Sequence, residues 1–151
     1  MSKHHDAELI LKLYDLRREA TMREARNWYF SFNPKTIDDV TATLFSDKSG
    51  LLRMVISYWD MAASLVNNGA IDAQMFNDAN GEHLFVYAKI EPFIPALREK
   101  FQNPDFLGHL ERIVKELPNS EEKLAVIRER IKAIAEAYEQ RAAAATAATT
   151  N

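Results

Sequence analysis

The segment LLRMVISYWDMAASLV, residues 51–66, is apolar at all but four positions. The four polar residues are Arg53, Ser57, Asp60 and Ser64, at steps of four, three and four. On a helix this spacing places them in one narrow stripe and leaves the rest of the circumference apolar. A helix of this kind lies in the middle of a bundle. The segment therefore predicts an all-α fold with residues 51–66 at its centre.

The size and composition of the chain indicate a single domain. Its 151 residues are enough to bury roughly 70% of the surface of the unfolded chain. There is no cysteine, which excludes disulfides, thiolate zinc sites and cysteine nucleophiles and favours a reducing cytoplasm. The first eight residues lack the apolar core of a signal peptide, and no uncharged apolar run approaches the roughly 20 residues that span a bilayer. We expect a soluble cytoplasmic domain without a membrane span.

The charge is slightly negative and unevenly distributed. The net charge of −3 divides into +2 over residues 1–35, −5 over residues 36–82 and 0 over residues 83–151. No cluster of Lys and Arg resembles the basic stripe that binds phosphates, so we expect no nucleic-acid partner. The acidic middle is typical of a solvated face.

A second segment, residues 82–101, is also apolar around most of its circumference and should form the other buried helix. It contains Pro92 and Pro95, which predict a kink or break near Glu91 because proline removes a backbone donor and crowds the preceding turn. Proline also marks helix boundaries elsewhere. Pro34 ends a helix that starts at about residue 6.

Capping residues mark the remaining helices. Thr36 and Asp39 have the spacing of a capping box, and Gly69 suits the left-handed residue that closes a helix. Asn103, followed by Pro104, predicts the start of a helix. We expect about five main helices and two short ones in one domain over residues 1–143, with a low-complexity Ala/Thr tail at 144–151. The predicted helices cover residues 6–32, 36–45, 51–66, 72–80, 82–101, 103–117 and a last helix from 120.

The polar stripe supplies the titratable groups closest to the predicted core. Asp60 can form a buried pair with Arg98 across the bundle, or it can act as an acid or base in a cleft between helices. No nucleophile with an adjacent base is apparent, which argues against an enzyme. The Glu-x-x-His motifs of a di-iron bundle are absent, and we expect no metal or other cofactor.

Two groups of apolar residues are candidates for binding. The aromatic residues Tyr58, Trp59 and Tyr87 are either core residues or the lining of a small pocket. The last helix carries apolar residues at alternating steps of three and four, which suit a partner helix. Together with an aromatic residue of the first helix they form the candidate interface: Trp28, Ile127, Ile131, Ile134 and Tyr138.

Residues 51–117 resemble an uncharacterised bacterial helical family known as a domain of unknown function. The similarity lies in an aromatic-acid pair on a helix, a glycine before Ile-Asp, and a helix leading through Pro-Phe-Ile to an arginine and an aromatic residue. The matching positions are Trp59, Asp60, Gly69, Ile71, Asp72, Pro92, Phe93, Ile94, Arg98 and Phe106. Many members carry an N-terminal membrane helix, which this chain replaces with charged residues 6–32. The resemblance implies an all-α fold. The family has no assigned activity, so the resemblance implies none for this chain.

The sequence thus predicts a soluble helical bundle that acts as a protein-interaction or self-assembly module, with itself or another protein as partner. A bundle that binds a small apolar molecule is the alternative, and an enzyme of unknown class is the third possibility.

Overall fold

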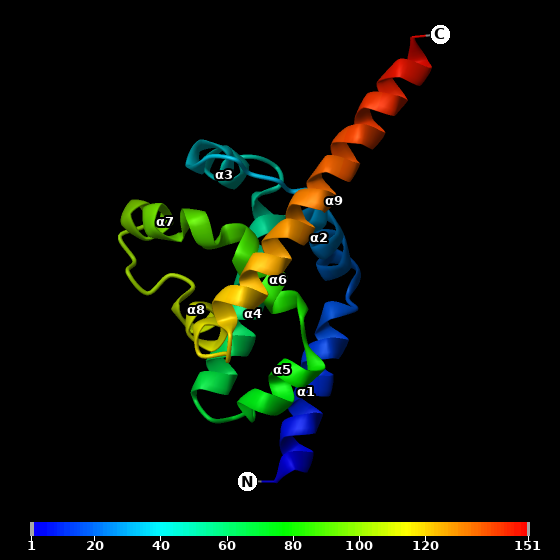
Figure 1. Cartoon of the computed structure of the whole chain (residues 1–151). Helices are drawn as coiled ribbons and strands as arrows, with labels where there is room; N and C mark the ends of the chain where they lie inside the picture. Colours follow the sequence, from blue (N-terminus) through cyan, green and yellow to red (C-terminus); the bar gives the residue numbers. More distant parts are fainter. Residues whose placement is uncertain (1, 151) are drawn as a thin grey trace.

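The protein is entirely helical in the part that the computed structural model describes, residues 2–150. This part contains nine α-helices, one short 3₁₀ helix and no strand, so the predicted all-α class is confirmed (Figure 1). The N-terminus and the C-terminus lie at opposite ends of the molecule (Figure 1). The elements are α1 Lys3–Arg17, α2 Ala20–Ser31, α3 Ile37–Leu44, α4 Ser49–Asn67, α5 Ala73–Ala79, α6 Glu82–Ile90, η1 Glu91–Phe93, α7 Ile94–Lys100, α8 Gly108–Lys115 and α9 Ser120–Thr149.

The core is built around α4 and α6, as the two apolar segments predicted. In α4 eight of the apolar residues are buried, whereas Arg53 and Ser57 of the polar stripe are exposed, as is Met61, and Asp60 and Ser64 are half-buried. In α6 six consecutive residues, 85–90, are buried, because other helices cover it on all sides. Burial of large apolar side chains is the main favourable term for such a core. The largest of them are Trp59, Tyr29, Tyr87 and Phe76.

The predicted helix over residues 6–32 is two helices in the structure. The chain bends at Arg18, and the Glu19 carboxylate accepts a hydrogen bond of 2.8 Å from the backbone N–H of Met22 to cap α2. If the two halves formed one straight helix, their apolar residues would lie on nearly opposite faces of it. The bend allows both faces to reach the core, where Leu13 and Tyr29 are buried.

The prolines and caps act largely as predicted. Pro92 lies in η1, which separates α6 from α7 at Glu91 and so confirms the expected break. The capping box of Thr36 and Asp39 begins α3. Gly69 follows α4 with a φ of 79°, the left-handed conformation predicted for it.

The helix predicted from Asn103 starts later than expected, at Gly108. Residues 101–107 instead form successive turns, in which Gln102 and Leu107 have φ angles of 50° and 56°. The side chain of Leu107 is buried, so this turn conformation is maintained by packing rather than by local preference. The connection between α7 and α8 is therefore a shaped loop.

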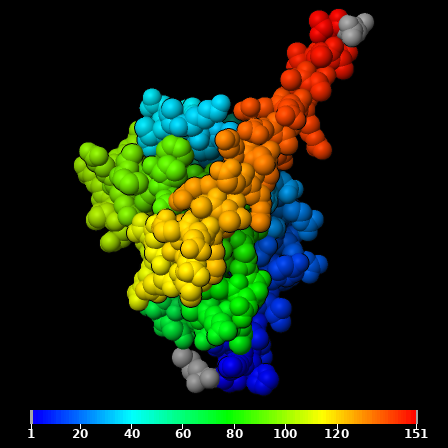
Figure 2. All heavy atoms as spheres, viewed as in Figure 1, coloured from blue at the N-terminus to red at the C-terminus, as the bar shows by residue number. Residues whose placement is uncertain are grey.

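The last helix, α9, lies partly on the body and partly beyond it. Its first half packs against α6, α2 and α8, with Leu124 fully buried. From Glu136 to Thr149 every side chain is exposed. Figure 2 shows this second half leaving the surface as an isolated rod.

Candidate functional site

Asp60 binds the start of α8. Leu107, the residue before α8, is left-handed and provides no side-chain cap, so the first N–H groups of α8 need another acceptor. The Asp60 carboxylate, projecting from α4, accepts a 3.0 Å hydrogen bond from the backbone N–H of Leu110. Asp60 therefore caps a helix that lies 50 residues further along the chain.

Arg98 binds the same connection from the other side. Its Nε donates to the Phe106 carbonyl at 2.9 Å, and its Nη2 lies 3.1 Å from the Glu111 carboxylate. The structure therefore does not place Asp60 and Arg98 in the direct pair considered above. They make two separate contacts that together hold residues 106–111 against the bundle.

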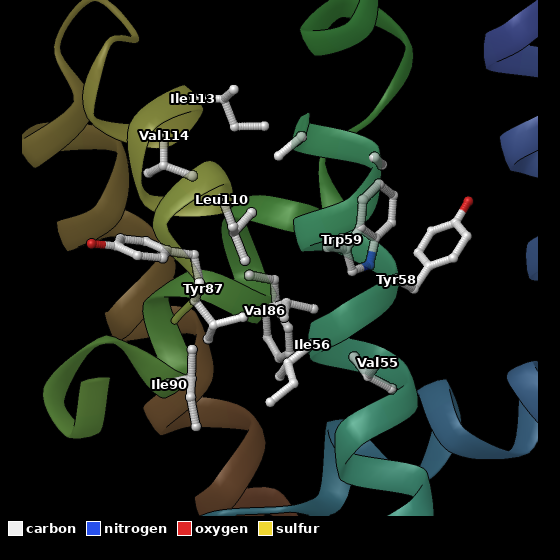
Figure 3. Packing of buried hydrophobic residues seen from close by; sticks show 14 of the residues in the cluster. Val55, Ile56, Tyr58, Trp59, Val86, Tyr87, Ile90, Leu110, Ile113 and Val114 are labelled. Carbon is white, nitrogen blue, oxygen red and sulfur yellow. The ribbon is translucent and has the colours of Figure 1, made fainter. Parts of the chain in front are cut away.

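The aromatic residues Tyr58, Trp59 and Tyr87 do not gather around one cavity. The Tyr58 hydroxyl donates to the Leu13 carbonyl, and burial raises its pKa to about 12. The Tyr87 ring lies beside Lys115, 6.0 Å from Nζ. Figure 3 shows the Tyr58 and Tyr87 rings at opposite sides of the core, with Trp59 next to Tyr58. All three are buried, the arrangement expected of core aromatics.

A buried ion cluster joins α1, α2 and α6. The Glu82 carboxylate lies 2.7 Å from Nη2 of Arg26 and 3.1 Å from Nη2 of Arg17, and all three side chains are largely buried. The hydrogen bond to Glu82 raises the pKa of Arg26. Arg17 also lies over the Trp59 ring, 5.2 Å from its centroid. A buried carboxylate between two guanidinium groups is a stabilising contact as long as all partners remain.

His83 lies next to this cluster and is completely buried. Its ring is 5.1 Å from the Phe76 ring and 5.7 Å from the Trp59 ring, and its Nε2 is 2.9 Å from Oδ1 of Asn77. Burial, followed by the charge of Arg17, lowers its pKa to about 4. His83 is therefore neutral at pH 7. Within residues 2–150, its Nδ1 has no hydrogen-bond partner, and the same holds for Nε1 of Trp59.

Lys89 is a buried cation in the last turn of α6. Its side chain is 7% exposed, and Nζ donates to the carbonyls of Tyr29 at 2.8 Å and Phe30 at 3.3 Å. Burial lowers its pKa to about 8. The two carbonyls belong to the last turn of α2, where the helix leaves carbonyl groups without their usual partners, although that of Tyr29 also accepts from the N–H of Phe32 at 3.2 Å. Lys89 therefore caps α2 at its negative end.

Sequence reasoning missed Glu82, His83 and Lys89 as polar core residues. A signal was present, since each interrupts the apolar pattern of the most buried helix. A polar residue at such a position must find a partner on another element. The pattern does not say which element supplies it.

The predicted interface residues differ in how far they are buried within their own chain. Trp28 is half-buried and stacks on Phe32 at 4.8 Å. Ile127, Ile131 and Ile134 are half-buried and pack against the core of their own chain. Tyr138, four residues after Ile134 in α9, lies beyond this contact and is 46% exposed.

Among the described residues there is no group of three or more His, Asp or Glu side chains placed to hold a metal ion. No helix within residues 2–150 is long and apolar enough to cross a bilayer.

The fold and these contacts define a helical domain in which α8 is held onto a buried two-helix core. Residues 3–117 match the model of the family described as a domain of unknown function, DUF4760, and the chain belongs to this family. The match ends before α9, which begins at Ser120. Comparison with curated proteins and with solved structures gave no match.

Proposed function

We propose that the protein is a self-assembly module in which two copies pair through the free halves of α9, residues 136–149. The observation that carries this proposal is the exposure of every side chain in this part of a continuous helix. A helix of 14 residues is marginal in water without packing, even when it is rich in alanine. A second helix alongside it would provide that packing.

The composition of the free half is compatible with a second copy of itself. Its charged residues are Glu136, Glu139 and Arg141, and none follows from 142 to 149. Two such surfaces meet without strong repulsion, and an antiparallel arrangement also opposes the two helix dipoles. It keeps the folded bodies at opposite ends and makes the contact self-complementary, as a two-fold dimer requires.

One face of the free half continues the face that α9 turns to its own core. Ile127, Ile131 and Ile134 follow one another at steps of four and three. Tyr138 is four residues after Ile134, and Ala145 is seven residues, or two turns, after Tyr138, so both continue the same face. Beyond the body this seam has no intramolecular partner among the described residues. The weak contact of Lys35 with Glu139, 3.8 Å between two largely exposed groups, lies beside the seam and does not cover it.

The area available sets the expected affinity. The 14 residues on each side are fewer than the roughly 20 to 30 of a standard interface. We therefore expect a weak dimer, with a dissociation constant on the order of 10 to 100 μM, in rapid exchange with monomer.

Sedimentation equilibrium over about 5 to 500 μM protein tests the proposal. We expect a shift from monomer to dimer across this range. Ala145→Glu, in the seam, should weaken the dimer at least about tenfold, because it places two charges in the contact. Ala143→Glu adds the same charge about 160° away from Ala145 around the helix and should behave as the parent. A parent chain that stays monomeric throughout, or equal effects of the two variants, contradicts the proposal.

A further inference from the structure

An apolar cavity of about 100 Å³ lies between α3, α4, α6 and α7. It is far larger than the roughly 15 Å³ needed to hold one water molecule, but its walls offer almost no hydrogen-bond partner. Most of its lining is aliphatic, and Ile56 and Ile90 are labelled in Figure 3. The aliphatic side chains are Val40, Leu44, Leu52, Ile56, Ile90 and Leu97.

The cavity lies next to an open hollow of about 500 Å³ that is lined by both polar and apolar side chains. Phe106 lines both spaces, as do Arg53 and Ile56. Phe106 is half-buried, and its ring packs edge-on against the ring of Phe101, 5.3 Å between centroids. The cavity and the hollow are therefore neighbours that share Phe106, Arg53 and Ile56 as lining residues.

The segment that carries Phe106 is held at defined points rather than along its length. Gln102 and Leu107, both left-handed, lie on either side of it, and a non-glycine residue pays for that conformation in strain. Arg98 holds the Phe106 carbonyl and Asp60 holds the N–H of Leu110. These contacts hold the backbone on both sides of Phe106, whose half-buried ring is held by packing alone.

Arg53 lines both spaces, with its aliphatic part at the wholly apolar cavity and its exposed guanidinium group outside it. Of the residues that line the cavity, Arg53 is the one with a polar side chain. Its Nε donates to Oγ of Ser49 at 3.2 Å, and within the described chain it is in no ion pair. Asp60 and Asp105 line the outer hollow but not the cavity. These carboxylates oppose any anionic group in the hollow, so a ligand carboxylate has to lie against Arg53, and a second anionic group is disfavoured.

We propose that this cavity binds the apolar part of a small branched monocarboxylate, whose carboxylate pairs with Arg53 while Phe106 covers the entrance. An apolar cavity of about 150 Å³ accommodates benzene, so by proportion the present one suits about four carbon atoms. The carboxylate end then lies at the open hollow. The site is separate from α9 and does not depend on self-association.

Titration of the ¹⁵N-labelled full chain with sodium isovalerate, followed by amide chemical shifts, tests the proposal. We expect saturable shifts around Val40, Leu52 and Phe106 with a dissociation constant on the order of 1 mM. The neutral isostere 3-methylbutan-1-ol should produce shifts at the same residues. No saturable shift with either probe up to about 20 mM overturns the proposal.

Charge and size variants separate the proposed site from general binding. Arg53→Gln should weaken isovalerate about fivefold and leave the alcohol unchanged, because the ion pair is partly exposed. Lys48→Gln, which removes a nearby exposed cation outside the cavity, should bind both probes as the parent does. Equal weakening of isovalerate by the two variants overturns the role of Arg53.

Leu44→Phe should fill the cavity and abolish binding of both probes, provided that circular dichroism shows it folded. Val40→Ala enlarges the same space and should allow the larger benzoate to bind at least about twofold more tightly than the parent does. This second variant tests the location if Leu44→Phe does not fold. Binding unchanged in a folded Leu44→Phe variant, or benzoate binding unaffected by Val40→Ala, overturns the proposed location.

Discussion

At the scale of single residues, His83 shows how burial changes the chemistry of a side chain. The imidazole is packed between aromatic rings with Arg17 close by, and both effects disfavour its charged form. Its pKa is lowered from 6.5 to about 4. The neutral ring is therefore a structural part of the core, and we expect it to make folding depend on pH.

The free energy of unfolding should fall as the pH is lowered from about 6.5 to about 4. In this range the unfolded chain takes up a proton at His83 that the folded chain does not, and the slope is about 1.4 kcal/mol per pH unit. Above pH 6.5 the ring is neutral in both states and contributes no slope. Urea denaturation at several pH values measures the effect.

The His83→Gln variant isolates this contribution from that of the carboxylates, which titrate in the same range. It should flatten the dependence between pH 6.5 and 4 relative to the parent. His4→Gln, at an exposed position, should leave the dependence as it is. If His83→Gln has the same slope as the parent, His83 is not the group responsible.

The identity of Asp60 as an important residue was accessible from sequence, but its partner was not. An acid in the polar stripe of a buried helix predicts a specific contact. The expected partner, Arg98, is a side chain of suitable charge. The observed partner is a backbone N–H, which every non-proline residue carries and which no sequence pattern distinguishes.

At the scale of elements, the start of α8 depends on α4. Asp60→Ala should remove the cap from α8 and lower the free energy of unfolding by about 1 kcal/mol. Asp105→Ala is the matched control, because this exposed carboxylate lies in the loop before α8 and accepts no hydrogen bond within the described chain. Urea denaturation followed by circular dichroism compares them. Equal stability of the Asp60→Ala and Asp105→Ala variants would count against the cap.

Helix ends were predictable where the signal is local. The capping box of α3 and the proline break after α6 depend on residues within a few positions of one another. The bend between α1 and α2 and the late start of α8 are different. In both cases the chain gives up helix so that apolar side chains such as Leu13 and Leu107 reach the core, and that gain depends on distant helices.

At the scale of the whole molecule, the family segment ends at residue 117 and α9 covers part of it. A chain shortened to residues 1–117 should lose about 3 to 5 kcal/mol of stability, because it no longer buries Leu124 and the half-buried Ile127, Ile131 and Ile134. A chain of residues 1–135 keeps these contacts and should match the full chain. Urea denaturation at low protein concentration, where the full chain is monomeric, makes the comparison.

The two shortened chains also show which half of α9 contributes to the stability of the monomer. If residues 1–117 are as stable as the full chain, α9 is not part of the folding unit. If residues 1–135 are markedly less stable, then the exposed half of α9 contributes to the monomer in a way that its weak contact with Lys35 does not explain.

The sequence by itself determined the all-α class, the two central helices and most helix boundaries. These follow from periodicity, caps and prolines, whose effects extend over a few residues. The tertiary structure alone decided which polar groups meet: Asp60 with the start of α8, Arg98 with Glu111, and Glu82 with two arginines. It also decided that Phe106 lines an apolar cavity together with residues of α3, α4, α6 and α7. The physical reason is that such contacts join positions far apart in the chain, and only the packing of the helices brings them within hydrogen-bond or van der Waals distance.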